Sequence, residues 1–182
     1  MKVTQDDFTL FEVKIDGKKV SFKGVEIVEQ GVEGLPIETK IKNDCTKEPV
    51  KELKDKFASF AKYAVDVLED VDLHNAQGQT GYVCTLFEQR KDMYQKQLES
   101  LYSVVGIKLK TVSKSLALEI SGFRTTVKGE IVPFCTHAIS MSDTTYGWEA
   151  DLENDWHELK GMMYEYIYLN KHANDGGALP IV

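Results

Sequence analysis

The sequence predicts an α+β protein in which antiparallel strands form two groups and helices cover one face of the sheet. Three observations lead to this class. Segments with period-two alternation occur in two separate groups, at 8–42 and 107–139. After each group comes a segment whose apolar residues recur at steps of three and four, which is typical of an amphipathic helix. Strands grouped apart from helices favour antiparallel pairing over alternating βαβ units.

The first group begins with two strands joined by a tight turn. The run FTLFEVKI alternates, with Phe11, Val13 and Ile15 on one side. Asp16-Gly17 follows, and a second run, KKVSFKGVEIV, comes directly after it. An Asp-Gly pair between alternating runs predicts a hairpin, because a type I′ turn needs positive φ at both central residues.

The second strand changes its apolar phase between Phe22 and Val25, and Gly24 lies at the change. We therefore expect a β-bulge at Gly24. A third strand is predicted at 35–42 (LPIETKIK), where Pro36 favours a strand start or a sheet edge.

A helix of roughly 20 residues is predicted from Val50 to Leu68 by apolar residues at helical spacing. The stretch 43–46 offers capping side chains before it, and Pro49 suits a first helical turn. The polar, glycine-containing stretch 66–81 predicts the main linker. A linker helix is expected at about 82–102, between the two groups of strands.

The second group of strands is predicted from alternation at 107–111, 116–120, 123–127 and 131–139. A final helix is expected at 148–171. The residues that recur there at steps of three and four are Trp148, Leu152, Leu159, Met162, Met163, Tyr166, Ile167 and Asn170, which together predict one apolar stripe.

The chain of 182 residues is long enough for one well-packed domain. We expect a single α+β domain over 1–182, with halves at about 1–70 and 103–173 and a flexible tail at 174–182. No apolar run has the length of a membrane span, and the amino terminus lacks a signal segment. Three widely spaced cysteines indicate reduced thiols and a cytoplasmic protein.

The net charge of −7 is distributed unevenly along the chain. The window 143–165 contains seven acids against one lysine, whereas 89–128 contains eight bases against three acids. Two regions of opposite sign can steer charged partners toward different sides of one molecule. The alternative is that the two regions pack close together and neutralise each other.

The acidic residues of the final helix form the first candidate site. Carboxylates one helical turn apart repeat at about 5–6 Å, which is comparable with the spacing of charges along a nucleic acid strand. Such a face would occupy a site made for nucleic acid, or it would be an ordinary solvated face. The residues predicted to bind a partner are Glu149, Asp151, Glu153, Asp155 and Glu158.

The basic residues of the second strand group form the other candidate site. Most of them alternate with Ile107, Leu109, Phe123 and Val127, so they are expected on the exposed side of the sheet, with one at a turn beside them. A face of this kind suits contact with phosphates, and the alternative is again a solubilising surface. The residues predicted to bind nucleic acid are Lys108, Lys110, Lys114, Arg124 and Lys128.

The sequence favours a protein with no enzymatic activity, cofactor or metal. Cys135 and His137 fall on one face of a strand, but the paired spacings of zinc sites are absent. Glu119, Glu130 and Asp143 lack a recognisable pattern for magnesium-dependent phosphoryl chemistry. The glycines do not form a phosphate-binding loop.

One stretch carries a resemblance to a known class of proteins. The block IVPFCTHAISMSDTTYGWEADLENDWHELKGMMYEYIYLNKHA resembles the ends of small phage and prophage proteins, in which a strand, a polar loop and an acidic-aromatic helix follow one another. The hairpin with DGKKVSF and the helix opened by Pro49 agree with this pattern. The chain is also similar to a phage-encoded inhibitor of type II CRISPR nucleases, although no functional residue of that family is carried over.

The resemblance implies an anti-CRISPR protein that acts in the bacterial cytoplasm on a guide-RNA-loaded nuclease. Such a nuclease has a positively charged channel for nucleic acid, so the acidic helix would compete there while the basic sheet would touch guide RNA or DNA. The rival hypothesis is a phage replication or recombination accessory protein that binds DNA through its basic sheet. A third is a metal-dependent enzyme.

Overall fold

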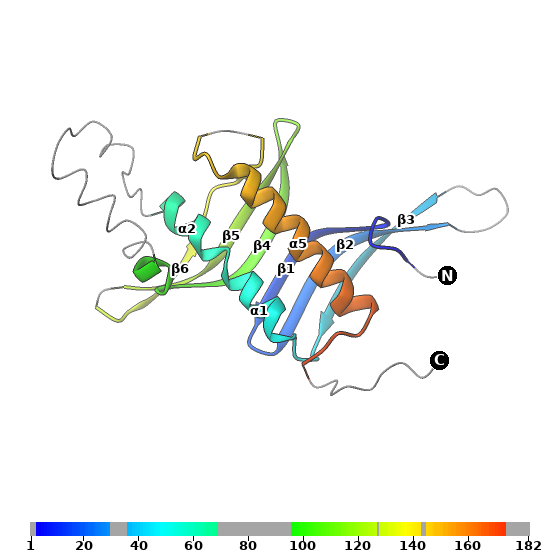
Figure 1. Ribbon diagram of the computed structural model, residues 1–182, viewed down its shortest axis with the longest axis horizontal. Coiled ribbons are helices and arrows are strands. Elements are labelled where there is room, and N and C mark those ends of the chain that lie inside the picture. The colour runs from blue at the N-terminus through cyan, green and yellow to red at the C-terminus, as the bar shows by residue number, and fades with distance from the viewer. Residues whose placement is uncertain (1–2, 30–35, 69–95, 127, 143–144, 174–182) are drawn as a thin grey trace.

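The computed structural model of the protein describes residues 3–29, 36–68, 96–126, 128–142 and 145–173. Its centre is one antiparallel sheet of seven strands in the order β3-β2-β1-β4-β5-β6, with β7 also paired to β5 (Figure 1). The strands are β1 (Phe8–Asp16), β2 (Lys19–Glu29), β3 (Pro36–Cys45), β4 (Tyr102–Val112), β5 (Ser115–Thr125), β6 (Ile131–Cys135) and β7 (Ile139–Ser140).

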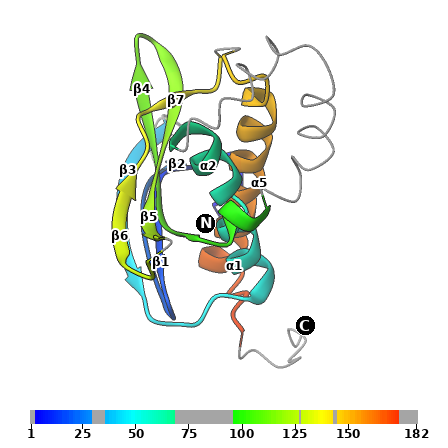
Figure 2. The ribbon, with the colours of Figure 1, turned by 90° about the vertical axis from the view of Figure 1, so that its left-hand side faces the viewer.

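Three helices pack on the same face of this sheet. They are α1 (Lys51–Ala58), α2 (Ala61–Leu68) and α5 (Glu149–Tyr168). Figure 2 views the sheet nearly edge-on, with the strands on one side and all three helices on the other. Of the described residues, none forms a helix over the opposite face, which we call the open face. The predicted α+β class is therefore confirmed, and the helices lie on one face as expected.

Two meanders, β1-β2-β3 and β4-β5-β6, form this single sheet. They are joined where β1 pairs with β4, and the pairing covers only Glu12–Lys14 opposite Gly106–Lys108. Beyond these residues the two strands diverge, so that the β4-β5 hairpin and the β2-β3 arm point in different directions (Figure 1). We call this short β1-β4 pairing the seam. Because the strands diverge beyond it, there is room on the open face beside the seam.

The predicted hairpin is confirmed, but the turn prediction is wrong. Asp16 still pairs with Lys19, so the two central residues are Gly17 and Lys18. Only Gly17 has a positive φ, of +60°, so this is not the type I′ turn expected for Asp16-Gly17. The β4-β5 turn has a less common backbone conformation, because Ser113 and Lys114 both have positive φ without being glycine.

The bulge expected at Gly24 is found in the neighbouring strand instead. In β1 the register shifts between Leu10 and Glu12, and Leu10 pairs with Gly24. A Cβ on Gly24 would lie only 2.4 Å from the Thr9 carbonyl oxygen, so the glycine is needed for close approach rather than for a bulge of its own. Consequently β2 keeps its alternation, and Val25 faces the side opposite Phe22.

The second meander repeats this arrangement. The register of β4 shifts between Val104 and Gly106, and Val104 pairs with Gly122 of β5. A Cβ on Gly122 would lie 2.0 Å from the Ser103 carbonyl oxygen. Each meander therefore combines a bulge in its first strand with a glycine in its second.

The single helix predicted from Val50 to Leu68 is two helices. The chain breaks between α1 and α2, where the Ser59 hydroxyl donates to the Lys56 carbonyl at 2.7 Å and the Phe60 N–H donates to the Phe57 carbonyl three residues earlier. The break allows Phe57 and Phe60 both to be buried.

The start of this helical region also differs from the prediction. The stretch 43–46 does not cap the helix, because β3 continues to Cys45 and the N-cap residue is Val50, which makes no side-chain cap bond. Pro49 lies in an isolated bridge with His172 rather than in the first helical turn.

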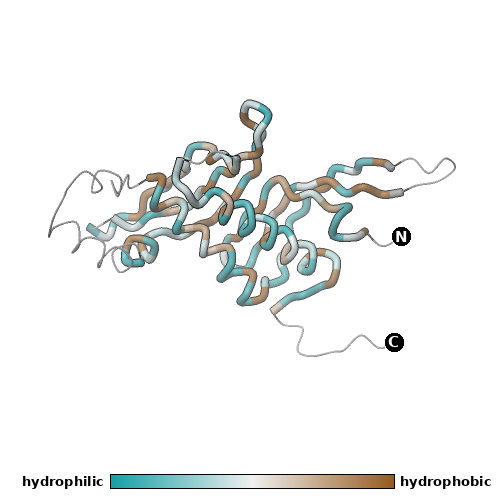
Figure 3. The backbone as a smooth tube through the Cα atoms, turned by 45° about the horizontal axis from the view of Figure 1, so that its top comes forward, coloured by the Kyte–Doolittle hydropathy of each residue, from teal (hydrophilic) through white to brown (hydrophobic). Residues whose placement is uncertain are grey.

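The core lies between the sheet and the three helices. From α5 it takes Leu152, Trp156, Leu159 and Met163, all at most 4% exposed. Apolar and polar stretches alternate along most strands and along α5, as Figure 3 shows by colour. Of the predicted linker helix, residues 96–99 are helical, whereas the rest before 96 and the tail at 174–182 lie outside the described residues.

Candidate functional site

The five acids predicted as a partner-binding face of α5 do not form one exposed row. Glu149 is only 4% exposed, and its Oε1 accepts a hydrogen bond from the Tyr146 N–H at 2.7 Å. It therefore ties the loop before α5 to the helix instead of facing a partner. Asp151 and Glu153 are exposed, and the only ion pair of Glu153 among the described residues is with His157 one turn away, at 3.8 Å.

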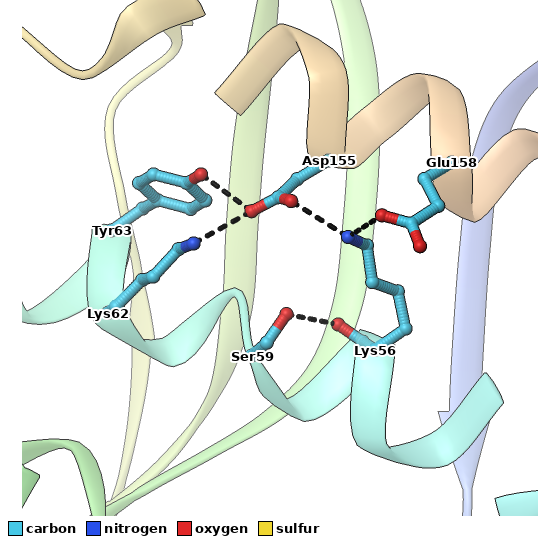
Figure 4. A network of polar contacts seen from close by, with 6 residues as sticks. All are labelled: Lys56, Ser59, Lys62, Tyr63, Asp155 and Glu158. Carbon is cyan, nitrogen blue, oxygen red and sulfur yellow. Dashed lines mark hydrogen bonds and ion pairs between the residues drawn. The ribbon is translucent and has the colours of Figure 1, made fainter. Parts of the chain in front are cut away.

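Asp155 lies at the centre of a polar network that joins α5 to α1 and α2 (Figure 4). Its two carboxylate oxygens accept from Lys56 Nζ at 2.7 Å, from Lys62 Nζ at 2.8 Å and from the Tyr63 hydroxyl at 2.6 Å. Partial burial alone would raise the pKa of Asp155, but these donors outweigh burial and lower the pKa to about 2. Burial and the nearby Asp155 carboxylate raise the pKa of Tyr63 well above its ordinary value.

Lys56 also forms an ion pair with Glu158, whose side chain is 59% exposed. Two of the five predicted acids are thus paired with lysines of α1 and α2, and a third is buried. The sequence-based alternative, mutual neutralisation of the acidic and basic regions, is also not what the structure shows. The acids of α5 are paired with the first helical region and not with the second strand group.

The basic residues predicted on one sheet face are divided between two faces and two turns. Lys108 and Lys110 lie on the open face of β4, and Lys110 forms an ion pair with Glu119 of β5. Lys114 is in the β4-β5 turn and Lys128 is in the turn before β6.

Arg124 lies on the helix-facing side, where its Nη1 is 3.3 Å from the Tyr102 hydroxyl. The sheet face predicted for Arg124 is wrong because β5 is one continuous strand with unbroken alternation. Since Ile120 is buried under the helices, the two-residue period also places Arg124 on that side, and Phe123 points outward with 47% exposure. The open face thus gains an aromatic residue and loses a predicted cation.

The register of the sheet places a charged row across the open face. Lys42 of β3 lies opposite Lys23 of β2, and Lys23 lies opposite Glu12 of β1. Across the seam, Glu12 lies opposite Lys108, which in turn lies opposite Glu119. Adjacent positions in this row belong to neighbouring strands about 4.8 Å apart.

A hollow of about 380 Å³ opens beside this row, where β1 and β4 diverge. Its charged lining comes from three strands of the first meander and one of the second: Glu12, Lys23, Lys40, Lys42 and Lys108. Its apolar lining consists of Phe11, Gly24, Ile41 and Leu109. Four cations against one carboxylate make it a positively charged hollow with an apolar lining, which we call the lysine hollow.

Glu12 is 9% exposed and its carboxylate is shared by Lys23 and Lys14, the latter at 3.1 Å. Burial acts to raise the pKa of Glu12, but the two lysines outweigh it, and the pKa is lowered. The carboxylate is therefore ionised and fully engaged. Within the described part of the chain, Lys40, Lys42 and Lys108 have no carboxylate at ion-pair distance.

Sequence reasoning missed the lysines of the first meander. Lys40 and Lys42 alternate with Ile37 and Ile41 in LPIETKIK, so their common face could have been predicted. Their proximity to Lys108 could not, because it depends on the pairing of β1 with β4, which no local pattern encodes.

The catalytic and metal hypotheses receive no supporting geometry. Among the described residues there is no group of three or more His, Cys, Asp or Glu side chains that could hold a metal ion. Cys135 and His137 are both exposed, and burial raises the pKa of the Cys135 thiol, which disfavours the reactive thiolate. Asp143 lies outside the described residues. None of the described helices has both the length and the apolar character needed to cross a membrane.

The fold and the site thus define an α+β protein with one antiparallel sheet, helices on a single face and a lysine hollow on the other. In comparisons with protein-family models, with curated proteins and with solved structures, nothing matches this chain. The functional argument therefore depends on the site itself.

Proposed function

We propose that this protein is a non-catalytic nucleic-acid-binding protein whose open sheet face, centred on the lysine hollow, contacts phosphates. The observation that carries the proposal is the direct pairing of Lys23 with Lys42 next to Lys40 and Lys108, which have no carboxylate at ion-pair distance among the described residues. Like charges directly opposite each other on a sheet destabilise it. An arrangement of this kind is unfavourable in the free protein and becomes favourable when an anion binds.

A polyanion fits this surface better than a single small anion does. The cations come from three strands, β2, β3 and β4, so they extend across the sheet rather than converging on one point. Their ammonium groups are point charges on flexible stems, which suits contact with phosphates without sequence discrimination. The exposed lysines would release counterions from the nucleic acid, so binding should depend strongly on salt.

The test is a variant in which Lys40, Lys42 and Lys108 are all replaced by glutamine. We expect this variant to bind a labelled nucleic acid of about 20 nucleotides at least roughly tenfold more weakly, with a salt slope smaller by about three. The measurement is fluorescence anisotropy at several salt concentrations. Because Lys42→Gln removes the repulsion with Lys23, the free energy of unfolding should stay the same or rise slightly.

The matched control replaces Lys47, Lys51 and Lys171 by glutamine. These residues are exposed and do not line the lysine hollow, and the change in net charge is the same. The control variant should keep wild-type affinity. Equal losses in both variants would show that only the overall charge matters, and the lysine hollow would then not be the binding site.

Inhibition of an RNA-guided nuclease stays a prediction, and the structure changes the surface through which we would expect it. Only Asp151 and Glu153 remain as exposed acids of α5 without a lysine partner among the described residues. We therefore propose that an inhibitory complex would use the lysine hollow against guide RNA or DNA. A pull-down with a guide-loaded type II nuclease, using wild-type protein and the triple-glutamine variant, separates this function from binding to free nucleic acid.

A further inference from the structure

We propose that the lysine hollow binds single-stranded nucleic acid, with one base stacked on Phe11 and its flanking phosphates on the surrounding lysines. This inference rests on the proposed function and names the form of nucleic acid that the site takes. It is carried by the position of Phe11 in the hollow and by a second hollow that continues along the open face.

Phe11 is the extra residue in the β1 bulge, between the paired positions Leu10 and Glu12. Its ring points away from the core, and the side chain is 41% exposed while it lines the lysine hollow. Without the bulge, strict alternation after Leu10 would still place Phe11 outward but would put Glu12 under the helices. The bulge thus brings an aromatic ring and the Glu12 carboxylate to the same face.

The aromatic ring lies among three lysines that have no carboxylate at ion-pair distance within the described residues. Lys40, Lys42 and Lys108 line the same hollow. The side chains of Ile41 and Leu109 alternate with these lysines and pack toward the core, so the exposed apolar surface of the hollow is the Phe11 ring. Every base has a π-face that stacks on an aromatic side chain, and lysines beside the ring can hold the phosphates that flank that base. This combination of an apolar surface and charged surroundings matches the two chemically different parts of a nucleotide.

A duplex would leave the apolar part of the site unused. Its bases are stacked on each other and paired, so only its phosphates could reach the lysines. A single strand can turn one base out of its stack and place it on Phe11. The apolar lining therefore favours single strands over duplexes, whereas the lysines serve both.

A second hollow, of about 260 Å³, continues the binding surface. It shares Glu12, Lys23 and Lys42 with the lysine hollow, and its further lining residues are Lys14, Ser21, Phe22 and the acidic Asp44. The two hollows are therefore neighbours on the open face, and a strand that places a base on Phe11 can run on toward Lys14. This continuity suits a chain of nucleotides rather than an isolated one.

The experiment compares Phe11→Ala with Phe123→Ala in binding to a labelled oligothymidine strand and to a labelled duplex of the same length. Phe123 is a matched control because it is also exposed on the open face, on β5, and does not line either hollow. We expect Phe11→Ala to weaken single-strand binding by roughly tenfold or more. Its duplex binding should stay within about twofold of wild type, and Phe123→Ala should affect neither probe.

Phe11→Trp provides the second arm, because tryptophan keeps an aromatic surface. We expect this variant to bind the single strand at least as tightly as wild type, with quenching of the added fluorescence by the stacked base. Equal affinity of wild type for both probes, or equal losses for both in Phe11→Ala, would overturn stacking while leaving phosphate binding intact. Failure of wild type to bind either probe would overturn the proposed function itself.

Discussion

Replacing Asp155 by asparagine is expected to lower the free energy of unfolding at pH 7 by about 2 kcal/mol. The carboxylate is 18% exposed and binds Lys56, Lys62 and Tyr63, so its charge holds α5 against α1 and α2. Asparagine keeps the shape but leaves Lys62 without its carboxylate partner and Lys56 with Glu158 alone. Urea unfolding followed by tryptophan fluorescence measures the change, because Trp156 is 4% exposed one residue away.

The same substitution should change the pH dependence of stability. The pKa of Asp155 is lowered from 3.8 to about 2 on folding, so its contribution is fully present above the unfolded pKa and is lost as the pH falls through the folded one. The difference between wild type and Asp155→Asn should therefore be largest near neutral pH. It should fall to roughly half near pH 3 and approach zero below pH 2.

Glu153→Gln is the matched control on the same helix. Glu153 is exposed, and its ion pair with His157 is long, at 3.8 Å. Replacing Glu153 should change the free energy of unfolding by less than about 0.5 kcal/mol. It should not alter how that free energy falls at low pH. If Asp155→Asn were equally mild, the network in Figure 4 would not be what anchors α5.

Gly122→Ala is expected to destabilise the protein by roughly 3 kcal/mol. The new Cβ would lie 2.0 Å from the Ser103 carbonyl oxygen, which belongs to the backbone of β4 and cannot rotate away. Relief requires the two strands to separate at the β4 bulge, next to the seam with β1. The measurement is again the midpoint and slope of urea unfolding.

A substitution at a second glycine should not lower the free energy of unfolding, and it therefore tests the steric explanation. Gly161 is inside α5, and the nearest atom to a Cβ there is the Gln5 side-chain nitrogen at 3.0 Å, the end of a flexible side chain. Alanine favours a helix over glycine by about 0.5–1 kcal/mol. Gly161→Ala should therefore be neutral or stabilising, and a loss comparable with that of Gly122→Ala would contradict the steric explanation.

Much of the fold follows from local patterns in the sequence. The Asp-Gly hairpin, the alternating strands of both groups and the final helix are encoded by turn chemistry and by periods of two and 3.6 residues. The predictions that were wrong concern the alternation of side chains between the two sheet faces at particular strand positions. Gly24 suggested a bulge in its own strand, and the apolar Phe123 suggested an inward side chain. In the structure the bulge lies opposite Gly24, and the ring is exposed.

The candidate site was harder to predict for a physical reason. The acids of α5 are conspicuous in the sequence, but their partners Lys56 and Lys62 lie nearly a hundred residues earlier. Likewise Lys108 joins Lys23 and Lys42 only because the two meanders share one sheet. Contacts between residues far apart in the sequence decide which charged side chains form ion pairs. The local composition of the chain does not predict these contacts.

The short seam between the meanders also has a consequence for the speed of folding. The β1-β2 and β4-β5 hairpins close over a few residues, whereas Glu12 and Lys108 must meet from 96 positions apart. Such non-local contacts are formed late and slow the approach to the native state. The lysine hollow, our proposed nucleic-acid site, includes residues from both sides of this join, so we expect it to be among the last parts of a newly made chain to form.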